Sequence, residues 1–279
     1  MVTTPKGIAI HRILNQPQNP QVLVADFSNS NLVKVRFFAP LITSWNSSPP
    51  PCGLYNHPSD VKTHWLTRNI FVADTQNNRI LKIKPGSGLP QFWDCDTWGT
   101  PGSGQGQFNE PVAIAIENKS GDMYVSDKGN NRIQKLNDRG EFILEFDNFW
   151  SSGMVVDFDN NLYVSVSSLN KVFKFTPDFT KVTEWNPAPN SFNSPIGIAV
   201  DHKNDVYVVN SGTQEVKKFT KEGVHMLSWG GSGIGNGKFK FPYGITYDFN
   251  IQRIFVSDNR QHTIQIFNED GSFVDKRII

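Results

Sequence analysis

The chain has 279 residues, of which 38% are hydrophobic and 19% are charged, and its formal net charge is +1. A chain of this length can bury a core without disulfide staples, and a charge near zero gives no indication of a polyanionic partner. No apolar run approaches the length of a transmembrane helix, and the first residues, Met1 to Pro5, lack the basic and apolar stretches of a secretion signal. We therefore predict a soluble chain without membrane insertion, whose compartment is unknown.

A short strand-end motif recurs six times along the chain. It reads Val-Ala-Asp or a close variant, recurs about every 46 residues as propeller blades do, and ends at Asp26, Asp74, Asp127, Val166, Asn210 and Asp258. A large aromatic residue stands nineteen positions after the motif in five of the six repeats, namely Trp45, Trp93, Phe146, Trp185 and Trp229. This periodicity predicts six similar structural units.

Each repeat resolves into four short segments rich in β-branched and aromatic residues, separated by polar turns. Four antiparallel strands cannot bury both faces alone, so each unit must stack on its neighbours. We therefore predict an all-β fold, a six-bladed β-propeller with four antiparallel strands per blade and each blade continuous in sequence. It is expected to form one domain over residues 1–279, with blades at approximately 5–46, 58–94, 111–147, 151–186, 195–230 and 242–279.

The wording of the repeat resembles a known family. Pro111-Val112-Ala113-Ile114-Ala115, Met123-Tyr124-Val125-Ser126-Asp127 and Asn130-Asn131-Arg132-Ile133-Gln134 together are similar to the NHL repeat, and Ile70 to Ile80 repeats the wording. Two glycine-rich linkers, after Trp98-Gly99 and after Trp229-Gly230, match each other in the spacing of their later glycines, a phenylalanine and a proline (Gly102, Gly104, Gly106, Phe108 and Pro111; Gly233, Gly235, Gly237, Phe239 and Pro242). Blades 1, 4 and 5 depart from the pattern, with Asn31, Lys171 and Glu215 in place of the arginine. The resemblance implies a propeller that binds through the rim formed by the turns after each motif.

The two cysteines, Cys52 and Cys95, exclude a disulfide framework. One bridge stays possible, although we expect two reduced thiols. Asn46-Ser47-Ser48 and Asn118-Lys119-Ser120 are N-glycosylation acceptors only if a eukaryotic cell secretes the protein.

The acidic residues of the motif have two interpretations. They could form an incomplete acidic ring, but an Asp at the end of a strand usually accepts hydrogen bonds from the amides of the turn that follows. We expect structural turn caps at Asp26, Asp74, Asp127, Asn210 and Asp258, because Asn210 can cap a turn without charge.

Enzymatic function depends on the residue after the opening proline of each blade. In the zinc-dependent amidating lyases of the family this position supplies histidines, whereas here it holds Lys6, Ser59, Val112, Ser152, Ile196 and Tyr243. Asp60 is the single acid in the next position, so a calcium-dependent lactonase is also poorly supported. We predict no catalytic residue, metal or cofactor, and a metal-dependent lyase or hydrolase remains an alternative.

The predicted function is a non-enzymatic scaffold that binds a protein or polar ligand, a glycan included, across a polar, nearly neutral rim. Single-stranded RNA is the alternative ligand, which needs a basic surface with stacking aromatic rings. Five lysines eight positions beyond the motif (Lys34, Lys82, Lys135, Lys174 and Lys218) are expected to pack along the blades with their heads in water. The candidate binding residues at the rim and channel mouth are Lys6, Phe27, Ser59, Asp60, Lys128, Tyr243 and Arg260.

Overall fold

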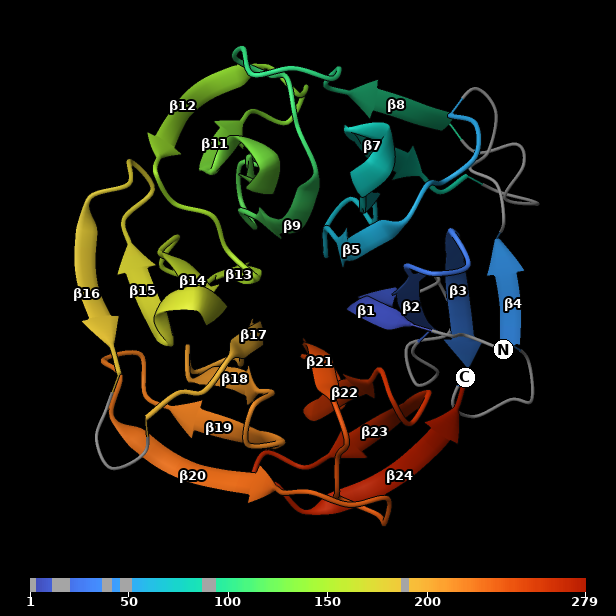
Figure 1. The fold of residues 1–279 in the computed structure, drawn as a ribbon, viewed down its shortest axis with the longest axis vertical. Coiled ribbons are helices and arrows are strands. Elements are labelled where there is room, and N and C mark those ends of the chain that lie inside the picture. Colours follow the sequence, from blue (N-terminus) through green and yellow to red (C-terminus); the bar gives the residue numbers. More distant parts are fainter. Residues whose placement is uncertain (1–3, 12–20, 37–41, 46–51, 87–93, 187–190) are drawn as a thin grey trace. The chain divides into compact units, whose positions relative to one another are not determined.

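The fold consists of six four-stranded antiparallel sheets (Figure 1). The structure is a computed structural model that describes residues 4–11, 21–36, 42–45, 52–86, 94–186 and 191–279. In every sheet the strands lie in sequence order, so each blade is continuous in the chain. The prediction of an all-β, six-bladed β-propeller is confirmed. Its assignment as one domain stays a prediction.

The strands of each blade are short and are joined by tight turns. Blades 1 to 3 comprise β1 (Pro5–His11), β2 (Gln21–Asp26), β3 (Asn31–Arg36), β4 (Ile42–Trp45); β5 (Pro58–Thr63), β6 (Ile70–Asp74), β7 (Arg79–Lys84), β8 (Asp94–Trp98); β9 (Pro111–Ile116), β10 (Met123–Asp127), β11 (Arg132–Leu136) and β12 (Phe142–Asp147). Blades 4 to 6 comprise β13 (Gly153–Val156), β14 (Leu162–Val166), β15 (Lys171–Phe175), β16 (Lys181–Trp185); β17 (Pro195–Val200), β18 (Val206–Asn210), β19 (Glu215–Phe219), β20 (His225–Gly230); β21 (Pro242–Asp248), β22 (Arg253–Asp258), β23 (Thr263–Phe267) and β24 (Phe273–Ile278). Three 3₁₀ turns, η1 (Thr75–Asn77), η3 (Lys128–Asn130) and η4 (Ser167–Leu169), follow the second strands of blades 2, 3 and 4. No helix of the described residues is long and apolar enough to cross a membrane.

The chain separates into two compact units. One contains Met1–Ile8 and Ser151–Ile279, and the other contains Ala9–Trp150. Blades 4 to 6 therefore belong to the first unit together with the start of β1, and blades 2 and 3 belong to the second with the rest of blade 1. Every site described below lies within one unit.

Burial falls from the second strand to the fourth strand of a blade. In blade 3 every residue of β10 is buried, whereas β12 is partly exposed along its length. A strand covered on both faces reads as a continuous apolar run, and one covered on a single side does not. This gradient explains why the strand-end motif is the most regular part of the repeat.

Tryptophans on the outer strands fill the wedge between consecutive blades. The ring of Trp98 lies against Gly140 of the next blade, and Trp185 and Trp229 lie in the same way against Gly223 and Gly271. A Cβ on Gly140 would come within 2.5 Å of the Trp98 ring, and its φ of +85° also favours glycine. These rings therefore serve packing and are not a ligand-stacking set.

In blade 2 the wedge residue is Trp98, which pairs with Ile80. The count of nineteen positions had selected Trp93, which lies outside the described residues, as does the side chain of Trp45. The outer strand of blade 2 begins at Asp94, later than the count places it, because more residues separate it from the third strand, which ends at Lys84, than in the other blades.

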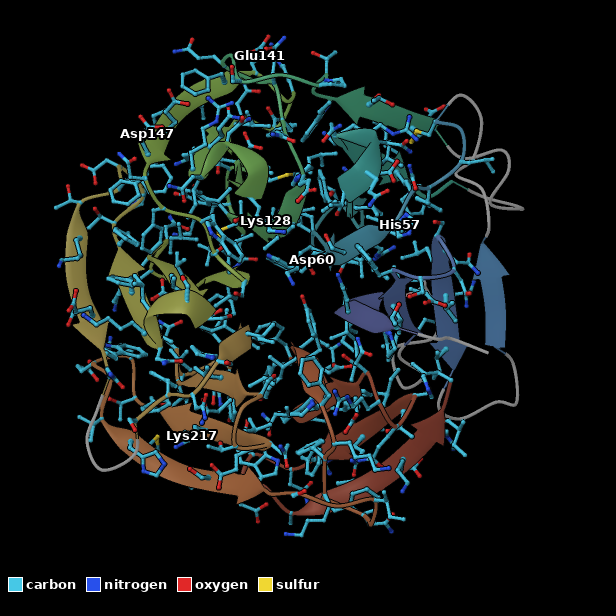
Figure 2. All side chains as sticks on the ribbon, in the orientation of Figure 1. His57, Asp60, Lys128, Glu141, Asp147 and Lys217 are labelled. Atoms are coloured by element: carbon cyan, nitrogen blue, oxygen red, sulfur yellow. A yellow bond between two sulfur atoms is a disulfide. The ribbon has the colours of Figure 1, made fainter. Side chains whose placement is uncertain are left out.

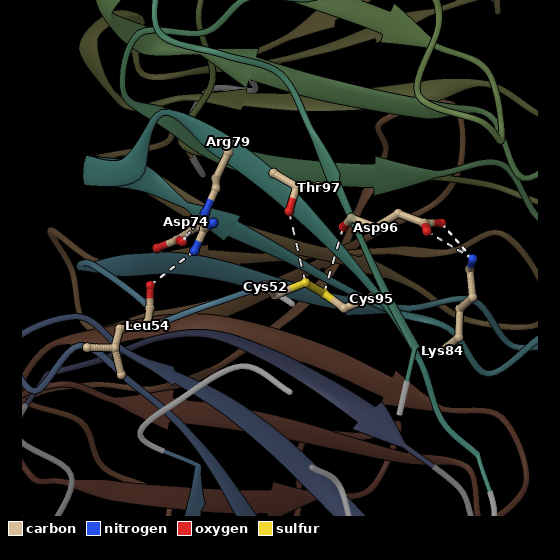
Figure 3. Close-up of a disulfide and its surroundings, with 8 residues drawn as sticks. All are labelled: Cys52, Leu54, Asp74, Arg79, Lys84, Cys95, Asp96 and Thr97. Carbon is tan, nitrogen blue, oxygen red and sulfur yellow. Dashed lines mark hydrogen bonds and ion pairs between the residues drawn. A yellow bond between two sulfur atoms is a disulfide. The ribbon is translucent and has the colours of Figure 1, made fainter. Parts of the chain in front are cut away.

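The expectation of two reduced cysteines is wrong: Cys52 and Cys95 form a disulfide (Figure 3). Their Cα atoms lie 5.9 Å apart, and both residues are buried. The bond joins the linker that enters blade 2 to the outer strand β8 of the same blade. Sequence spacing could not show this pairing, since only the folded blade brings the linker against β8.

Candidate functional site

The acid at the end of the second strand is enclosed by hydrogen bonds in blade 3. One oxygen of Asp127 accepts the amide of Asn109 at 2.7 Å, and the other accepts the side chains of Asn130 at 2.8 Å and Arg132 at 2.9 Å. Arg132 also pairs with Glu145 at 2.7 Å and donates to the linker carbonyls of Gly104 and Gln107. The carboxylate thus ties the turn, the third strand and the incoming linker together.

The other motif residues make similar contacts. Asp74 accepts from Asn56, Asn77 and Arg79 at 2.7 to 2.8 Å, and Asn29 donates to Asp26 at 2.8 Å. In blade 5 the uncharged Asn210 accepts the amide of Asn193 and donates to Thr213. These contacts favour a structural role over an exposed acidic ring.

Paired asparagines after the motif have separate tasks. The first, Asn77 or Asn130, donates its side chain to the motif acid. The second, Asn78 or Asn131, ends the 3₁₀ turn in the left-handed conformation, at φ of 53° and 52°. Asparagine is among the few residues other than glycine that adopt this conformation readily.

The five lysines eight positions beyond the motif do not all keep their ammonium groups in water. The expectation that they do is therefore wrong for two of them. Lys135 is buried, and its ammonium pairs with Glu117 at 2.7 Å and lies 5.1 Å from the Tyr124 ring centre. Lys218 is likewise buried between Asp201 and Asp205, over the ring of Tyr207. Buried, paired lysines cannot contact a phosphate backbone, so these two do not support RNA binding.

The pKa of Glu117 reflects this network. Burial alone would raise its pKa, but hydrogen bonds from Lys135, Tyr124 and Ser120, together with the charge of Lys135, outweigh burial and hold the pKa below the ordinary value of 4.5. Glu117 is therefore an ionised structural group at neutral pH. Glu117, the acid that follows the first strand of blade 3, thus pairs with buried groups of its own blade.

Ser59 and Asp60, predicted at the channel mouth, are both buried on β5. Figure 2 shows the position of Asp60. Asp60 accepts the amides of Val61 and Ile114 at 2.9 Å and the ammonium of Lys62 at 3.1 Å. Burial raises the pKa of Asp60 above 3.8 and exceeds the opposing effects of Lys62 and the amides. Ser59 bonds to Thr75 and to the carbonyl of Val112, so both polar side chains are already engaged by the fold.

Two further candidates lie in the same unit but have local partners. Lys128 is exposed, forms an ion pair with Glu110 at 3.2 Å and lies 5.9 Å from the Trp150 ring (Figure 2). Phe27 meets the ring of His57 edge to face, with 4.8 Å between ring centres. The pairing with Glu110 cancels the positive charge that Lys128 would offer to a ligand.

The glycine-rich linkers of blades 3 and 6 have the same backbone construction. Gln134 accepts the amide of Gly106 and donates to the carbonyl of Gln107, and Gln265 makes the same two bonds to Gly237 and Lys238. Short parallel bridges join Pro101 to Phe108 and Ser232 to Phe239. Identical scaffolds therefore present different side chains.

The side chains of the blade 6 linker are basic and apolar where those of blade 3 are polar or acidic. Ile234 replaces Ser103, Lys238 replaces Gln107, Lys240 replaces Asn109 and Phe241 replaces Glu110. Ile234 is 67% exposed, and Lys238 and Lys240 are exposed as well. We call Lys6, Ile234, Lys238, Lys240, Phe241, Tyr243 and Arg260 the blade 6 patch; all of them lie in one unit.

Cations lie over aromatic rings in the blade 6 patch. The Arg260 guanidinium is 5.7 Å from the centre of the Phe241 ring, and the Lys6 ammonium is 6.0 Å from that of Tyr243. The two rings are neighbours, with centres 6.3 Å apart. The structure thus brings together three sequence-predicted residues, Lys6, Tyr243 and Arg260. Sequence reasoning missed Phe241 and Ile234, although aligning the two linkers could have found both.

Metal-ligating side chains do not gather in the described part of the chain. No group of three or more His, Cys, Asp or Glu residues there has the geometry to hold a metal ion. Four of the described histidines have side-chain partners: His57 bonds to Asn56, His64 to Thr67, His202 to Tyr247 and His225 to Ser228. The Nδ1 atom of His262 is buried without a hydrogen-bond partner among the described residues.

One blade of the chain matches a known repeat family. A profile of the NHL repeat matches residues 192–219, which span the second and third strands of blade 5 and the strand before them. The chain carries the NHL repeat. The predicted resemblance to the NHL repeat is thereby confirmed, and the match lies in blade 5, which has Glu215 in place of the arginine. Peptidyl-glycine alpha-amidating monooxygenase B of Xenopus laevis is 33% identical over 88 residues, which are 31% of this chain and 10% of that protein's length.

Solved structures resemble this chain over nearly all of its length. A streptogramin B lyase has a TM-score of 0.67 at 15% identity and covers 99% of this chain and 83% of its own. Virginiamycin B lyase from Staphylococcus aureus has a TM-score of 0.66 at 16% identity, covering 100% and 85%. A protein of unknown function from Bacteroides thetaiotaomicron has a TM-score of 0.71 at 15% identity, covering 95% and 69%. At these identities the likeness shows the fold alone.

Proposed function

We propose that the protein is a non-enzymatic binding module whose ligand contacts lie in the blade 6 patch. Its ligand is a protein or other polar molecule that presents negative charge beside an apolar surface. The observation that carries this proposal is the set of cations beside the partly exposed rings of Phe241 and Tyr243, on a linker that also exposes Ile234. Lys238, Lys240 and Arg260 form no ion pair within the described residues.

The chemistry of the patch suits a small binding hot spot. A cation over an aromatic ring contributes about 0.5 to 1 kcal/mol at an exposed site and more when a partner excludes water. Arginine and aromatic residues dominate binding energies at interfaces, and charges at the rim mainly speed association. An acidic group bound between Arg260 and Lys240, with an apolar group against Phe241 and Ile234, would use both effects.

Single-stranded RNA is the second candidate ligand, because the same patch places aromatic rings beside cations. Salt dependence distinguishes it from a protein ligand. Each phosphate contact contributes a slope of roughly −0.7 to the logarithmic salt dependence of single-strand binding. A protein contact with few ion pairs responds much less to salt.

A lyase or hydrolase is the third candidate, and the fold shared with streptogramin lyases motivates it. The positions that would supply metal ligands hold Lys6, Ser59 and Tyr243 among others, with no histidine. Bound metal in protein purified without chelator, in stoichiometric amount, would favour this candidate.

The test is affinity capture from the native source with and without nuclease, comparing wild type with a Phe241→Ala/Arg260→Ser double variant. The matched control in blade 3 is Lys128→Ser, which alters a rim cation outside the patch. We expect a nuclease-resistant partner to bind wild type and the control and to be lost at least tenfold in the patch variant. Equal capture by all three proteins would refute the patch as the binding surface.

A further inference from the structure

The acceptor sequence Asn118-Lys119-Ser120 occupies a surface turn. The turn connects β9 to β10 and is closed by the amide of Gly121, which donates to the carbonyl of Glu117 at 3.1 Å. Lys119 and Ser120 are exposed, and Asn118 is half-buried. Surface turns of this kind are where N-linked sugars are tolerated in folded proteins.

The side chain of Asn118 has no task in the fold that a sugar would disturb. Within the described residues its only hydrogen bond is through the backbone carbonyl, which lies 3.1 Å from Nε2 of His64. By contrast, Asn77 and Asn130 each donate their side-chain amides to a motif carboxylate. The Asn118 amide is therefore available for modification, whereas theirs are part of the blade.

The disulfide supplies an independent indication of the compartment. Cys52 and Cys95 are buried and bonded in blade 2, in the same unit as Asn118. Structural disulfides form and persist in oxidising compartments and are rare in the cytosol. A chain that folds there passes the machinery that reads Asn-X-Ser sequences in eukaryotes.

We propose that Asn118 is N-glycosylated. The side-chain nitrogen of Asn118 attacks C1 of the first N-acetylglucosamine of a lipid-pyrophosphate-linked oligosaccharide. The N–C1 bond forms, the bond from C1 to the pyrophosphate oxygen breaks, the lipid pyrophosphate leaves with the electron pair, and one amide proton passes to a base of the transferase. In the folded protein the Ser120 hydroxyl donates to Glu117 at 2.8 Å, so the transfer precedes the folding of this turn.

The location gives the glycan a physical effect on the neighbouring turn. His64, which contacts the Asn118 carbonyl, directly precedes Trp65 and Leu66, and these are 63% and 62% exposed. Adjacent exposed apolar side chains of this size favour association with other molecules. A bulky hydrophilic sugar beside them shields this surface.

The proposal is tested on full-length protein from its native source. Digestion with peptide N-glycosidase in ¹⁸O-labelled water converts a glycosylated Asn118 to labelled aspartate, which mass spectrometry detects. Disulfide mapping of the same sample determines the state of Cys52 and Cys95. We expect the label at residue 118 together with an oxidised pair.

Matched variants expressed in a secreting eukaryotic cell line complete the test. Asn118→Gln and Ser120→Ala should each remove one glycan-sized gel shift, whereas Ser120→Thr should retain it because threonine also completes the acceptor. An Asn46→Gln variant separates any modification at the other acceptor, whose structure lies outside the described residues. An unlabelled Asn118 in the native protein, whether the cysteines are oxidised or reduced, overturns the proposal.

Discussion

Blades 2 and 3 satisfy their polar groups internally, whereas blade 6 leaves charge at its surface. In blade 3, Asp127 is paired with Arg132, which is 5% exposed, and the rim cation Lys128 is paired with Glu110. In blade 6, Asp258 accepts backbone amides, among them those of Lys240 and Phe241, together with the side chain of Gln261. Arg260 lies instead over the Phe241 ring.

The difference shows that the same linker backbone can be held by different side chains in the two blades. In blade 6 the side chain of Gln261 donates to the linker carbonyls of Gly233 and Lys238. In blade 3 Asn130 and Arg132 share the equivalent contacts to Gly102 and Gln107. The structural work in blade 6 is thus done without a buried arginine. Arg260 and Lys240 are exposed and form no ion pair within the described residues, whereas the Lys238 ammonium donates to the carbonyl of Gly230 at 2.6 Å.

The largest expected loss of stability comes from removing the disulfide of blade 2. The Cys52→Ser/Cys95→Ser variant opens a loop spanning 43 residues, which in the chain-entropy model costs about 4 kcal/mol of stability. Urea unfolding of oxidised wild type and the variant measures the loss. A loss below about 1 kcal/mol would show that noncovalent contacts alone hold the linker against β8.

Removing the charge of the motif acid should cost more stability in blade 3 than in blade 6. Asp127→Asn leaves the buried Arg132 with Glu145 as its remaining carboxylate, and the expected cost is about 3 kcal/mol. Asp258→Asn removes a carboxylate that receives amides and no arginine, and the expected cost is about 1 kcal/mol. Chemical denaturation of both variants gives the difference, and equal losses would contradict the contrast between the two blades.

Acid should weaken blade 3 through Glu117. Its folded pKa lies below the unfolded value, so its contribution is present above about pH 4.5 and is lost as the pH falls through the folded pKa. In Lys135→Met the hydrogen bond that lowers this pKa is gone, so the stability should be lower at pH 7 by about 1 to 2 kcal/mol. The loss of stability between pH 5 and pH 3 should be shallower than in wild type.

Blade 6 has Ile266 at the position of Lys135, which supplies the control for the acid experiment. Ile266→Val changes packing alone and should leave the slope of stability against pH unchanged. Unfolding curves at several pH values distinguish the variants. Parallel curves for Lys135→Met and wild type would show that Glu117 does not contribute to the acid response.

The smallest stability effect is expected at the proposed binding surface. Arg260→Ser removes an exposed side chain outside any ion pair of the described residues, so stability should change by less than about 0.5 kcal/mol. Ligand capture should nevertheless fall severalfold. A stability loss comparable with that of Asp127→Asn would instead assign Arg260 a structural role.

The repeat pattern predicted the strands and blades correctly. It did not predict contacts between segments that are distant in the sequence. Asp258 accepts the amides of Arg260 and Gln261 in the turn that follows it, as expected of a strand-end acid. Asp74 and Asp127 differ from the expectation, because their side chains accept linker amides instead of amides of the following turn. The buried lysines could not be predicted, since the partners of Lys135 lie on two other strands of its blade. The pairing of Cys52 with Cys95 was missed for the same reason.

The sequence by itself determined the number of blades and their strand order, because short apolar strand segments and polar turns act locally and recur six times. Only the tertiary structure decided which charged groups are buried in ion pairs inside the blades and which remain at the surface. The pairing of a lysine, a cysteine or a rim arginine depends on the distance between side chains from separate strands and linkers, and that distance is set by the packing of the whole blade.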